Sequence, residues 1–476
     1  MSWNVKMDIL LVEADYKNKY PPLGLMKISA YHKSEGDNVV FVKGMNEELK
    51  SKKWNRIYVT TLFTFYWKKT IETIEYYHKS VERPSDIYVG GILATLLEQE
   101  LRDAPQLEGI TIMTGLLDKP NMLGNELVPI DRMTPDYSII SKDTNSYLEY
   151  EYDVQNAYIT STTKGCIRKC SFCAVSVLEP EYCEYLDIKD QIEEINTAYG
   201  EKRDLMLMDN NILASNRLTE IVDDLVSLGF ARNNKSYKNI QGKRVFYQTR
   251  RVDFNQGVDA RLLTEEKMRE LSRLEIHPLR IAFDHADEES IRIYVNAQRL
   301  AAKYNVKNLS NYILFNFDDT PKDLYKRLQI NIELNEEFHS KGLKTSIWSF
   351  PMKYMPISGE YSKNRKFVGK HWNAKMLRGV QCILNATHAV VGPKRDYFEL
   401  AFGRNFDEFL ELIYMPELYI TKRKQNTTKI NKWKSIFRSL SEIEREEFIS
   451  LIKDNKFPKM DIQNSKIRGL YECYYK

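Results

Sequence analysis

The stretch Thr163-Lys164-Gly165-Cys166-Ile167-Arg168-Lys169-Cys170-Ser171-Phe172-Cys173 places three thiols in a Cys-x3-Cys-x2-Cys spacing. The chain has 476 residues and six cysteines, and three of these cysteines fall within eight positions. So few cysteines cannot build a dense disulfide framework, and thiols this close together cannot each pair economically with distant partners. The motif therefore indicates a metal site in a protein of a reducing compartment.

Three thiolates in one tight loop favour an iron–sulfur cluster. The backbone N–H groups of the loop, with Arg168 and Lys169, can offset the negative charge of such a cluster. Three ligands leave one iron of a [4Fe-4S] cubane open, and the amino and carboxylate groups of S-adenosylmethionine (SAM) can chelate it. An electron passed to the sulfonium would then break a carbon–sulfur bond and yield a 5′-deoxyadenosyl radical. The alternative is a structural zinc site with Cys183 or a histidine as the fourth ligand.

The sequence around the motif alternates between short apolar runs and helical patterns, as a parallel α/β structure does. About six such units in a row predict a complete or partial parallel barrel. The candidate strands are Ala157 to Thr160, Leu205 to Met208, Asp253 to Val258, Leu279 to Phe283, Tyr312 to Phe315 and Thr345 to Trp348.

The N-terminal part repeats the same alternation and predicts a Rossmann-like parallel sheet. Met7 to Val12 is a short apolar run typical of a buried parallel strand. Pro21 to Gly24 opens a helix, and Gly36-Asp37 ends it before the strand Val39 to Val42. Further apolar runs continue to about residue 115. They are Ile57 to Val59, Ile87 to Val89 and Ile110 to Ile112.

Residues 116–155 have weak periodicity and suggest a linker, whereas the pattern after residue 396 is charged and helical. We therefore expect an α/β chain in three parts. A Rossmann domain with its linker covers residues 1–145, a partial (β/α)6 barrel covers 146–395, and a helical extension covers 396–476.

Composition excludes some classes of protein. The hydrophobic content of 43% is enough for a large core. The net charge of +4 is too small to indicate a nucleic-acid partner by itself. No signal-peptide pattern and no bilayer-spanning apolar run is present, so we expect a soluble, cytoplasmic protein without a membrane partner.

On these residues the chain resembles the radical SAM superfamily, and within it the branch that couples a cobalamin (B12)-binding-like Rossmann domain to a radical SAM barrel. The resemblance covers about residues 7–350. Besides the cysteine loop, it rests on Pro21 to Leu25, Val89 to Thr95 and Pro135 to Tyr137. It implies an enzyme that holds a [4Fe-4S] cluster on the three cysteines and cleaves SAM reductively. It also implies an external low-potential electron donor such as flavodoxin or ferredoxin.

The resemblance extends to two segments near the cluster. In the superfamily an aromatic residue between the second and third cysteines lies against adenine, and Phe172 holds that position; simple packing is the alternative. The strand end Asp204 to Asn211 lacks the common Gly-Gly-Glu form. Asp209 and Asn211 there either contact SAM or the substrate, or cap the following helix.

Two later strand ends carry polar side chains. Asn255, Gln256, Asp259 and Arg261 suit the ribose hydroxyls and the carboxylate of SAM, and a structural ion pair between Asp259 and Arg261 is the alternative. Asp284-His285 follows the next strand and could shuttle protons or form part of a wall. No catalytic residue is assigned.

The sequence leaves open whether the N-terminal domain binds cobalamin. The Asp-x-His-x-x-Gly motif that supplies a lower axial histidine is absent. Cobalamin would then be held by backbone contacts around Gly90-Gly91 and Gly115, or the domain has lost the cofactor and only shapes the substrate pocket. Methylation is an option if cobalamin binds. The remaining cysteines stand alone, so a second cluster is not expected.

One segment bears on the substrate. Between Lys344 and Arg395 there are ten basic residues and one acid, Glu360, interleaved with aromatic residues. This composition suits phosphates and stacked bases, although a solvated basic face produces the same pattern. We therefore expect a radical SAM enzyme acting on an unidentified substrate, with nucleic acid, a nucleotide or another polyanion as a candidate. The alternative is a zinc-stabilised nucleic-acid-binding protein without catalysis.

Overall fold

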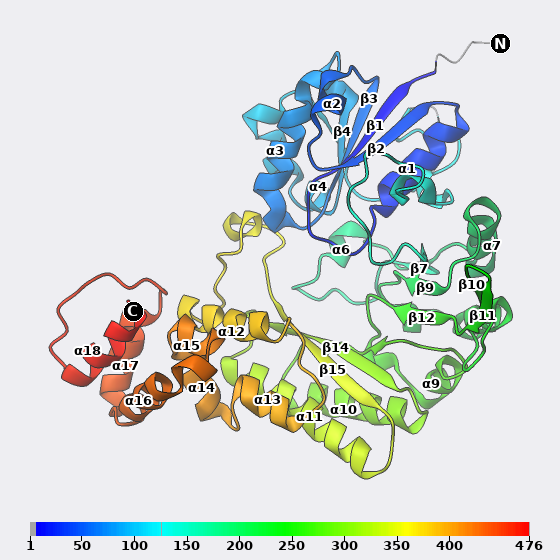
Figure 1. Cartoon of the computed structure of the whole chain (residues 1–476). Coiled ribbons are helices and arrows are strands. Elements are labelled where there is room, and N and C mark those ends of the chain that lie inside the picture. The colour runs from blue at the N-terminus through cyan, green and yellow to red at the C-terminus, as the bar shows by residue number, and fades with distance from the viewer. Residues whose placement is uncertain (1–5, 125, 476) are drawn as a thin grey trace. The chain divides into compact units, whose positions relative to one another are not determined.

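The structure is a computed structural model that describes residues 6–124 and 126–475 (Figure 1). The chain divides into two compact units. The first holds the described residues up to Gln256, with Arg269–Ile276 and Met355–Phe367. The second holds Gly257–Met268, His277–Tyr354 and the described residues from Val368 onward. In the part of the chain that is described, no helix combines the length and apolar character needed to cross a membrane.

The first unit contains a five-stranded parallel sheet in the order β2-β1-β3-β4-β5 (Figure 1). Ile9 to Val12 of β1 are all fully buried, because a parallel strand covered on both faces has no solvent side. The predicted Rossmann-like sheet is thus confirmed. Its strands are β1 (Asp8–Glu13), β2 (Asn38–Lys43), β3 (Arg56–Thr61), β4 (Ile87–Gly91) and β5 (Thr111–Ile112). Its helices are α1 (Leu23–Ser34), α2 (Glu47–Ser51), α3 (Trp67–Tyr77), α4 (Ile92–Leu96) and α5 (Glu98–Arg102).

The strand order reverses at β1, which pairs with β2 on one side and with β3 on the other. In open parallel sheets, ligands bind outside the carboxyl ends of the strands at such a reversal. By this rule, a ligand is expected near the ends of β1 and β3.

The first unit also contains a parallel sheet in the order β12-β9-β6, which carries the cysteine loop. These strands are β6 (Ala157–Thr160), β9 (Asp204–Leu207) and β12 (Arg251–Phe254). Two short strands, β7 (Thr163–Lys164) and β8 (Cys183–Glu184), pair antiparallel on either side of the loop. The helices of this part are α6 (Val175–Leu178), α7 (Ile188–Tyr199) and α8 (Leu218–Leu225).

A hairpin of β10 (Tyr237–Gln241) and β11 (Arg244–Gln248) precedes β12 and was not predicted. Its register places Ile240 opposite Val245, and Tyr247 lies on the same face. These three side chains are 61%, 53% and 57% exposed, respectively. The apolar side chains of this hairpin are exposed, so its sequence lacks the buried apolar pattern that predicts a core strand.

The second unit contains a parallel sheet in the order β13-β14-β15, with helices α10 and α11 (Figure 1). Its strands and helices are β13 (Leu279–Arg280), β14 (Asn308–Phe315), β15 (Ser346–Lys353), α10 (Glu288–Lys303) and α11 (Pro321–Ser340). Helix α9 (Glu265–Leu271) contributes residues to both units. Thr320 and Asp323 form a capping box that starts α11.

The chain is helical after β15, as predicted for the extension from residue 396. The helices are α12 (Ala374–Ala386), α13 (Arg395–Phe402), α14 (Phe406–Tyr414), α15 (Glu417–Thr421), α16 (Thr427–Arg438), α17 (Glu442–Ile452) and α18 (Ser465–Tyr471). Strands lie at all six positions expected of the barrel, three in each unit. The closure of these strands into one barrel and the domain boundaries at residues 145 and 395 stay predictions.

Candidate active site and cofactor cavity

The cysteine loop begins at a residue that only glycine can occupy without strain. Gly165 has a φ of +71°, and a Cβ atom there would lie 2.1 Å from the backbone oxygen of Glu181. This close approach lets the chain turn directly from β7 into Cys166. Two donors point at the Cys166 thiol: the Arg168 N–H, 3.3 Å from Sγ, and Asn211 Nδ2, 3.5 Å from Sγ. Both are hydrogen-bond donors that the structure places at this sulfur.

Asp209, just beyond β9, fixes the start of the loop. Its Oδ1 accepts hydrogen bonds from the backbone N–H and the hydroxyl of both Thr162 and Thr163, at 2.6–3.0 Å. Burial raises the pKa of Asp209, and these hydrogen bonds offset part of that rise. The carboxylate therefore acts on the loop that carries the thiols, and its contact with SAM remains a prediction.

Asn211 lies beside the first cysteine with one polar atom unused. The residue is 2% exposed, and its Oδ1 is buried with no hydrogen-bond partner in the structure. A buried amide oxygen normally has a donor, so this atom leaves room for a donor from a ligand. The neighbouring Asn210 is satisfied instead, because its Nδ2 donates to Glu179 at 2.8 Å.

The three thiols of the motif are half-buried, as is Phe172 between the second and third of them. The Cys173 N–H donates to the backbone oxygen of Cys170 at 3.0 Å, which tightens this end of the loop. Among the residues that the structure describes, no group of three or more His, Cys, Asp and Glu side chains is drawn together around a single metal-ion position.

The end of β12 in the first unit holds Asn255 firmly. Tyr20 donates to its Oδ1 at 2.9 Å, and its Nδ2 lies 3.7 Å from the sulfur of Met208. Gln256, the next residue, is exposed. Both polar atoms of the Asn255 side chain are thus engaged within the protein, whereas the side-chain amide of Gln256 is accessible to a ligand.

In the second unit, Asp259 and Arg261 form the ion pair that the sequence offered as an alternative. The guanidinium donates to both carboxylate oxygens, at 2.7 and 3.1 Å. The charges of Asp259 and Arg261 act on the nearby carboxyl group of Asp284. Burial raises the pKa of Asp284, although His285 and Arg327 oppose the rise. The fully buried Arg327 donates to the backbone oxygen of Asp284 at 3.1 Å.

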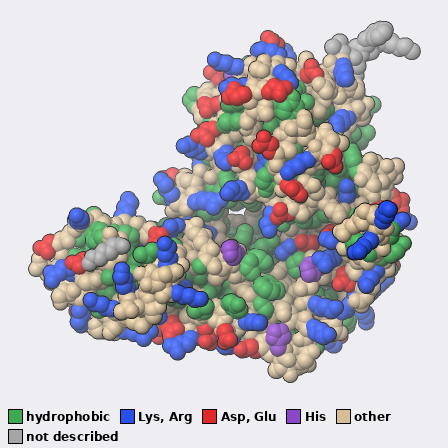
Figure 2. All heavy atoms as spheres, in the orientation of Figure 1, with side chains coloured by type: hydrophobic (Ala, Val, Ile, Leu, Met, Phe, Trp, Pro, Cys, Tyr) green, Lys and Arg blue, Asp and Glu red, His purple; other side chains and the backbone are tan. Residues whose placement is uncertain are grey.

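Part of the basic segment is engaged inside the chain. Lys363 lies 4.2 Å from the ring centroid of Trp67, and Arg395 forms an ion pair of 2.5 Å with Glu336. Arg365, Lys375 and Arg378 are also held by contacts within the chain. On the face drawn in Figure 2, Lys and Arg side chains are interspersed with Asp and Glu. At least half of the ten basic residues thus have contacts within the chain.

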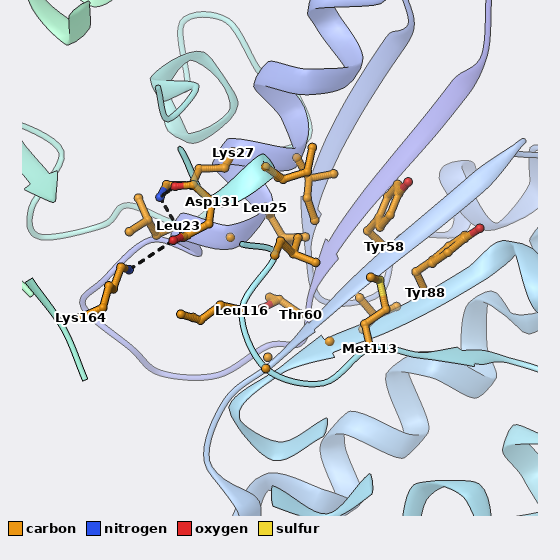
Figure 3. Close-up of a pocket in the computed structure, with 18 residues that line it drawn as sticks. Leu23, Leu25, Lys27, Tyr58, Thr60, Tyr88, Met113, Leu116, Asp131 and Lys164 are labelled. Carbon is orange, nitrogen blue, oxygen red and sulfur yellow. Dashed lines mark hydrogen bonds and ion pairs between the residues drawn. The ribbon is translucent and has the colours of Figure 1, made fainter. Parts of the chain in front are cut away.

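A cavity of about 260 Å³ lies in the first unit, outside the carboxyl ends of β3, β4 and β5 (Figure 3). Gly90, Gly91 and Gly115, expected from the sequence to approach a cofactor, all line it. Gly91 has a φ of +104°, and a Cβ atom there would lie 2.5 Å from the Thr61 backbone oxygen. Most other lining side chains are apolar. Among them are Leu23, Leu25, Ile28, Val59, Met113, Leu116, Leu117 and Ile130.

One end of the cavity carries an ion cluster that the sequence did not reveal. Lys27 and Lys164 both face Asp131 (Figure 3), at 3.1 and 3.7 Å between nitrogen and carboxylate oxygen. Burial raises the pKa of Asp131, but the two ammonium groups and the hydrogen bonds to the carboxyl group lower it overall below its usual value. Lys164 directly precedes the cysteine loop. This position next to the motif was the only feature of the sequence that could have pointed to the ion cluster.

No protein-family model matches the chain, and no curated protein matches it. Solved structures do. The cobalamin-dependent SAM radical enzyme OxsB, with aqua-cobalamin and SAM bound, superposes with a TM-score of 0.51 at 11% identity, over 99% of this chain and 79% of that one. The radical SAM methyltransferase TsrM from Kitasatospora setae, with cobalamin and a [4Fe-4S] cluster bound, gives 0.45 at 14% identity, over 72% and 74% of the two chains. The likeness to OxsB shows that the two proteins share a fold.

Proposed function

We propose that this chain, which shares the fold of a cobalamin-dependent radical SAM enzyme, is itself a radical SAM enzyme with Cys166, Cys170 and Cys173 as cluster ligands. The observation that carries the proposal is the environment of Cys166. Its sulfur receives two N–H donors, and the Asp209 carboxylate secures the turn before it. Three soft thiolates in a half-buried loop with such donors fit a [4Fe-4S] cluster. When bound, the cluster supplies the electron that cleaves SAM into methionine and a 5′-deoxyadenosyl radical.

The residues around the loop would hold SAM against the cluster. The unpartnered Oδ1 of Asn211 can accept a hydrogen bond from the SAM amino group, and Phe172 would lie against the adenine ring. The amide of Gln256 would reach the ribose, with Asn255 as the wall behind it. The resemblance to the radical SAM superfamily also implies Asp259 and Arg261 as contacts to the ribose and carboxylate of SAM, and in the second unit these two side chains pair with each other.

Cobalamin forms the second part of the proposal. The glycine-lined cavity at the carboxyl edge of the Rossmann sheet supports binding in the first unit. When bound, cobalamin would supply methyl-transfer chemistry, and the chain's own task would be to hold it without an axial histidine. Backbone groups around Gly90-Gly91 and Gly115 would do so, since no side chain blocks their approach.

The partners follow from this chemistry. We propose an external low-potential electron donor, such as flavodoxin or ferredoxin, because cleavage of SAM consumes an electron. A nucleic acid, nucleotide or other polyanion stays the candidate substrate. The composition overstates the support for this substrate class, because at least five of the ten basic residues contact other parts of the chain.

The test is anaerobic reconstitution with iron and sulfide, followed by reduction in the presence of SAM. We expect about four iron and four sulfide per chain, as a cubane requires, and formation of 5′-deoxyadenosine. Cys170→Ser should abolish both, whereas the exposed Cys183→Ser should behave like the wild type. Stoichiometric zinc with no 5′-deoxyadenosine would contradict the proposal and favour a zinc-stabilised binding protein.

A further inference from the structure

The β10–β11 hairpin belongs to the first unit and forms a two-stranded sheet of its own (Figure 1). In such a sheet, directly paired residues share a face, and so do residues two positions apart on one strand. The register pairs Lys238 with Tyr247 and Ile240 with Val245, so these four side chains lie on one face. All four are exposed. We call this set the outer face of the hairpin.

The opposite face of the hairpin is held by contacts within the first unit. It carries Tyr237, Asn239, Phe246 and Gln248, which are all half-buried. Asn239 Nδ2 donates to Gln248 Oε1 at 3.1 Å and so joins the two strands on this side. The Arg250 guanidinium lies 5.8 Å from the ring centroid of Tyr237. These contacts leave the outer face toward solvent.

The base of the hairpin is anchored on the segment that follows α8. Ser236 Oγ donates to the backbone oxygen of Gly229 at 2.7 Å, and a Cβ atom at Gly229 would lie only 2.7 Å from that hydroxyl oxygen. Arg250 is 4% exposed, forms an ion pair of 3.0 Å with Glu201, and lies 5.3 Å from the ring centroid of Phe230. The outer face is therefore carried on a fixed support.

The ionisable side chains of the hairpin and its flanks are all basic. Between Val226 and Val252 there are seven Lys and Arg residues and no Asp or Glu. Arg250 is neutralised by its ion pair with Glu201. Four others are exposed and form no ion pair within the described part of the chain. They are Lys235, Lys238, Lys243 and Arg244. An anionic partner would therefore meet unpaired positive charge beside the outer face.

The outer face fits a nucleic acid better than a protein surface. A stable protein interface buries about 800 Å² on each partner and is poor in lysine. The outer face has only three apolar side chains, and three of the four unpaired cations are lysines. A nucleic-acid strand needs less area, because a base stacks on a single aromatic ring while basic side chains contact the phosphates.

The exposed aromatic ring also favours a single strand over a duplex. Tyr247 is 57% exposed, with Val245 two positions away on the same face. The bases of a duplex are already stacked on one another, whereas those of a single strand can stack on a protein ring.

We propose that the outer face of the β10–β11 hairpin binds a single-stranded nucleic acid. One base stacks on Tyr247, and the Ile240–Val245 pair contacts the next base. Lys238 and Lys243 bind the adjoining phosphates. This inference rests on the substrate part of the proposed function and narrows it to nucleic acid, but the binding itself requires neither the cluster nor SAM.

The test is fluorescence anisotropy of labelled oligonucleotides mixed with the full chain. The probe is a single-stranded RNA of about twelve nucleotides, within the range of about 4–16 that single-strand sites cover. Comparison probes are the DNA strand of the same sequence and the RNA duplex. We expect a single strand to bind at least about fivefold more tightly than the duplex, the contribution of one stacked base. Binding of either strand supports the inference, and the tighter one identifies the sugar.

Variants separate the two kinds of contact. Lys238→Gln with Lys243→Gln removes two phosphate contacts, so the slope of log affinity against log salt should fall in magnitude by about 1.4. Lys68→Gln with Lys79→Gln removes the same charge from exposed side chains outside the hairpin and should leave the slope unchanged. Tyr247→Ala should weaken binding at least about fivefold, whereas Tyr247→Phe keeps the ring and the affinity. Circular dichroism confirms that the variants fold.

Four results would overturn the inference. They are no binding of either strand by the wild type, equally tight binding of the duplex, equal losses in the two double variants, and wild-type affinity of Tyr247→Ala. Polyglutamate serves as a competitor, and displacement of the strand as effective as by unlabelled RNA would indicate an acidic polypeptide as the partner instead.

Formation of 5′-deoxyadenosine is measured separately on the reconstituted protein. If the wild type forms this product but binds no strand, the radical SAM proposal stands and the inference about the hairpin fails. If the wild type binds the strand but forms no 5′-deoxyadenosine, the nucleic-acid site stands and the radical SAM proposal fails. The hairpin variants should form the product at the wild-type level without nucleic acid, because the proposed cluster and SAM contacts lie outside the hairpin.

Discussion

Asp209 Oδ1 accepts hydrogen bonds from both the backbone N–H and the hydroxyl of Thr163, at 2.6 and 2.8 Å. Through this contact, the end of one strand holds the residue that leads into the cysteine loop. The carboxylate of Asp209 is 46 positions away in sequence, so the support for the loop is tertiary rather than local.

Replacement of Asp209 by Ala should destabilise the protein and impair cluster loading. The variant leaves the buried donors of Thr162 and Thr163 without an acceptor, so we expect a loss of about 2–4 kcal/mol in the free energy of unfolding. Denaturant titration measures this loss, and iron content after reconstitution should fall with it. Asp204→Ala, at the start of β9 and paired with Arg203, should cost less than about 1 kcal/mol. Similar losses in the two variants would contradict this role.

Gly165→Ala should be far more damaging than Gly200→Ala. Both glycines have positive φ, at +71° and +74°, so both variants carry the strain that an alanine meets at positive φ, about 1–3 kcal/mol. Only at Gly165 would the added Cβ collide with backbone, the oxygen of Glu181, so a further loss of about 1–3 kcal/mol is expected. Thermal unfolding of the two variants checks the difference. Equal melting temperatures would show that the loop start can relax.

Asn211→Ala should weaken SAM binding without unfolding the protein. We expect an increase of about tenfold in the dissociation constant, since one hydrogen bond to the SAM amino group is lost. Equilibrium binding of SAM to the reconstituted protein measures it. Asn210→Ala is the matched control, because its amide already donates to Glu179. An Asn211→Ala variant with wild-type affinity would remove this residue from the SAM site.

Lys375 gives a pH-dependent prediction in the C-terminal helices. Its Nζ donates to the backbone oxygens of Ile413 and Met415, and burial lowers its pKa from 10.5 to about 8. Between pH 8 and 10.5 the folded state therefore binds fewer protons than the unfolded state, so stability from this group rises with pH across that window. The free energy of unfolding of the wild type minus that of Lys375→Met should therefore increase from pH 8 to pH 10.5. Denaturant titrations at both pH values test it, and a flat difference would contradict the lowered pKa.

Local sequence patterns predicted the elements, whereas the contacts between distant residues were beyond them. The run Ile9 to Val12 marked a buried strand because its apolar character is continuous. The six strands expected of the barrel lie within a few residues of their predicted places, as β6, β9, β12, β13, β14 and β15. The spacing of the thiols likewise needed no structure. The Lys27–Asp131 contact spans 104 positions, so no periodicity could indicate it.

The structure adds contacts at two polar strand ends whose roles toward SAM stay predictions. Asp209 supports the cysteine loop through two threonines, and Asp259 pairs with Arg261. The β10–β11 hairpin was not predicted because its apolar side chains face solvent, whereas the apolar side chains of a core strand are buried. Roles toward SAM for Phe172 and Gln256 stay predictions.

The chain crosses between its two units five times, at residues 256/257, 268/269, 276/277, 354/355 and 367/368. A ribosome that has completed residue 256 has therefore not yet made two pieces of the first unit. Trp67 still lacks Lys363, and β12 still lacks the bridge from Val252 to Ile276. The cysteine loop is synthesised early but belongs to a unit that closes only after residue 367, so this unit is completed late in biosynthesis.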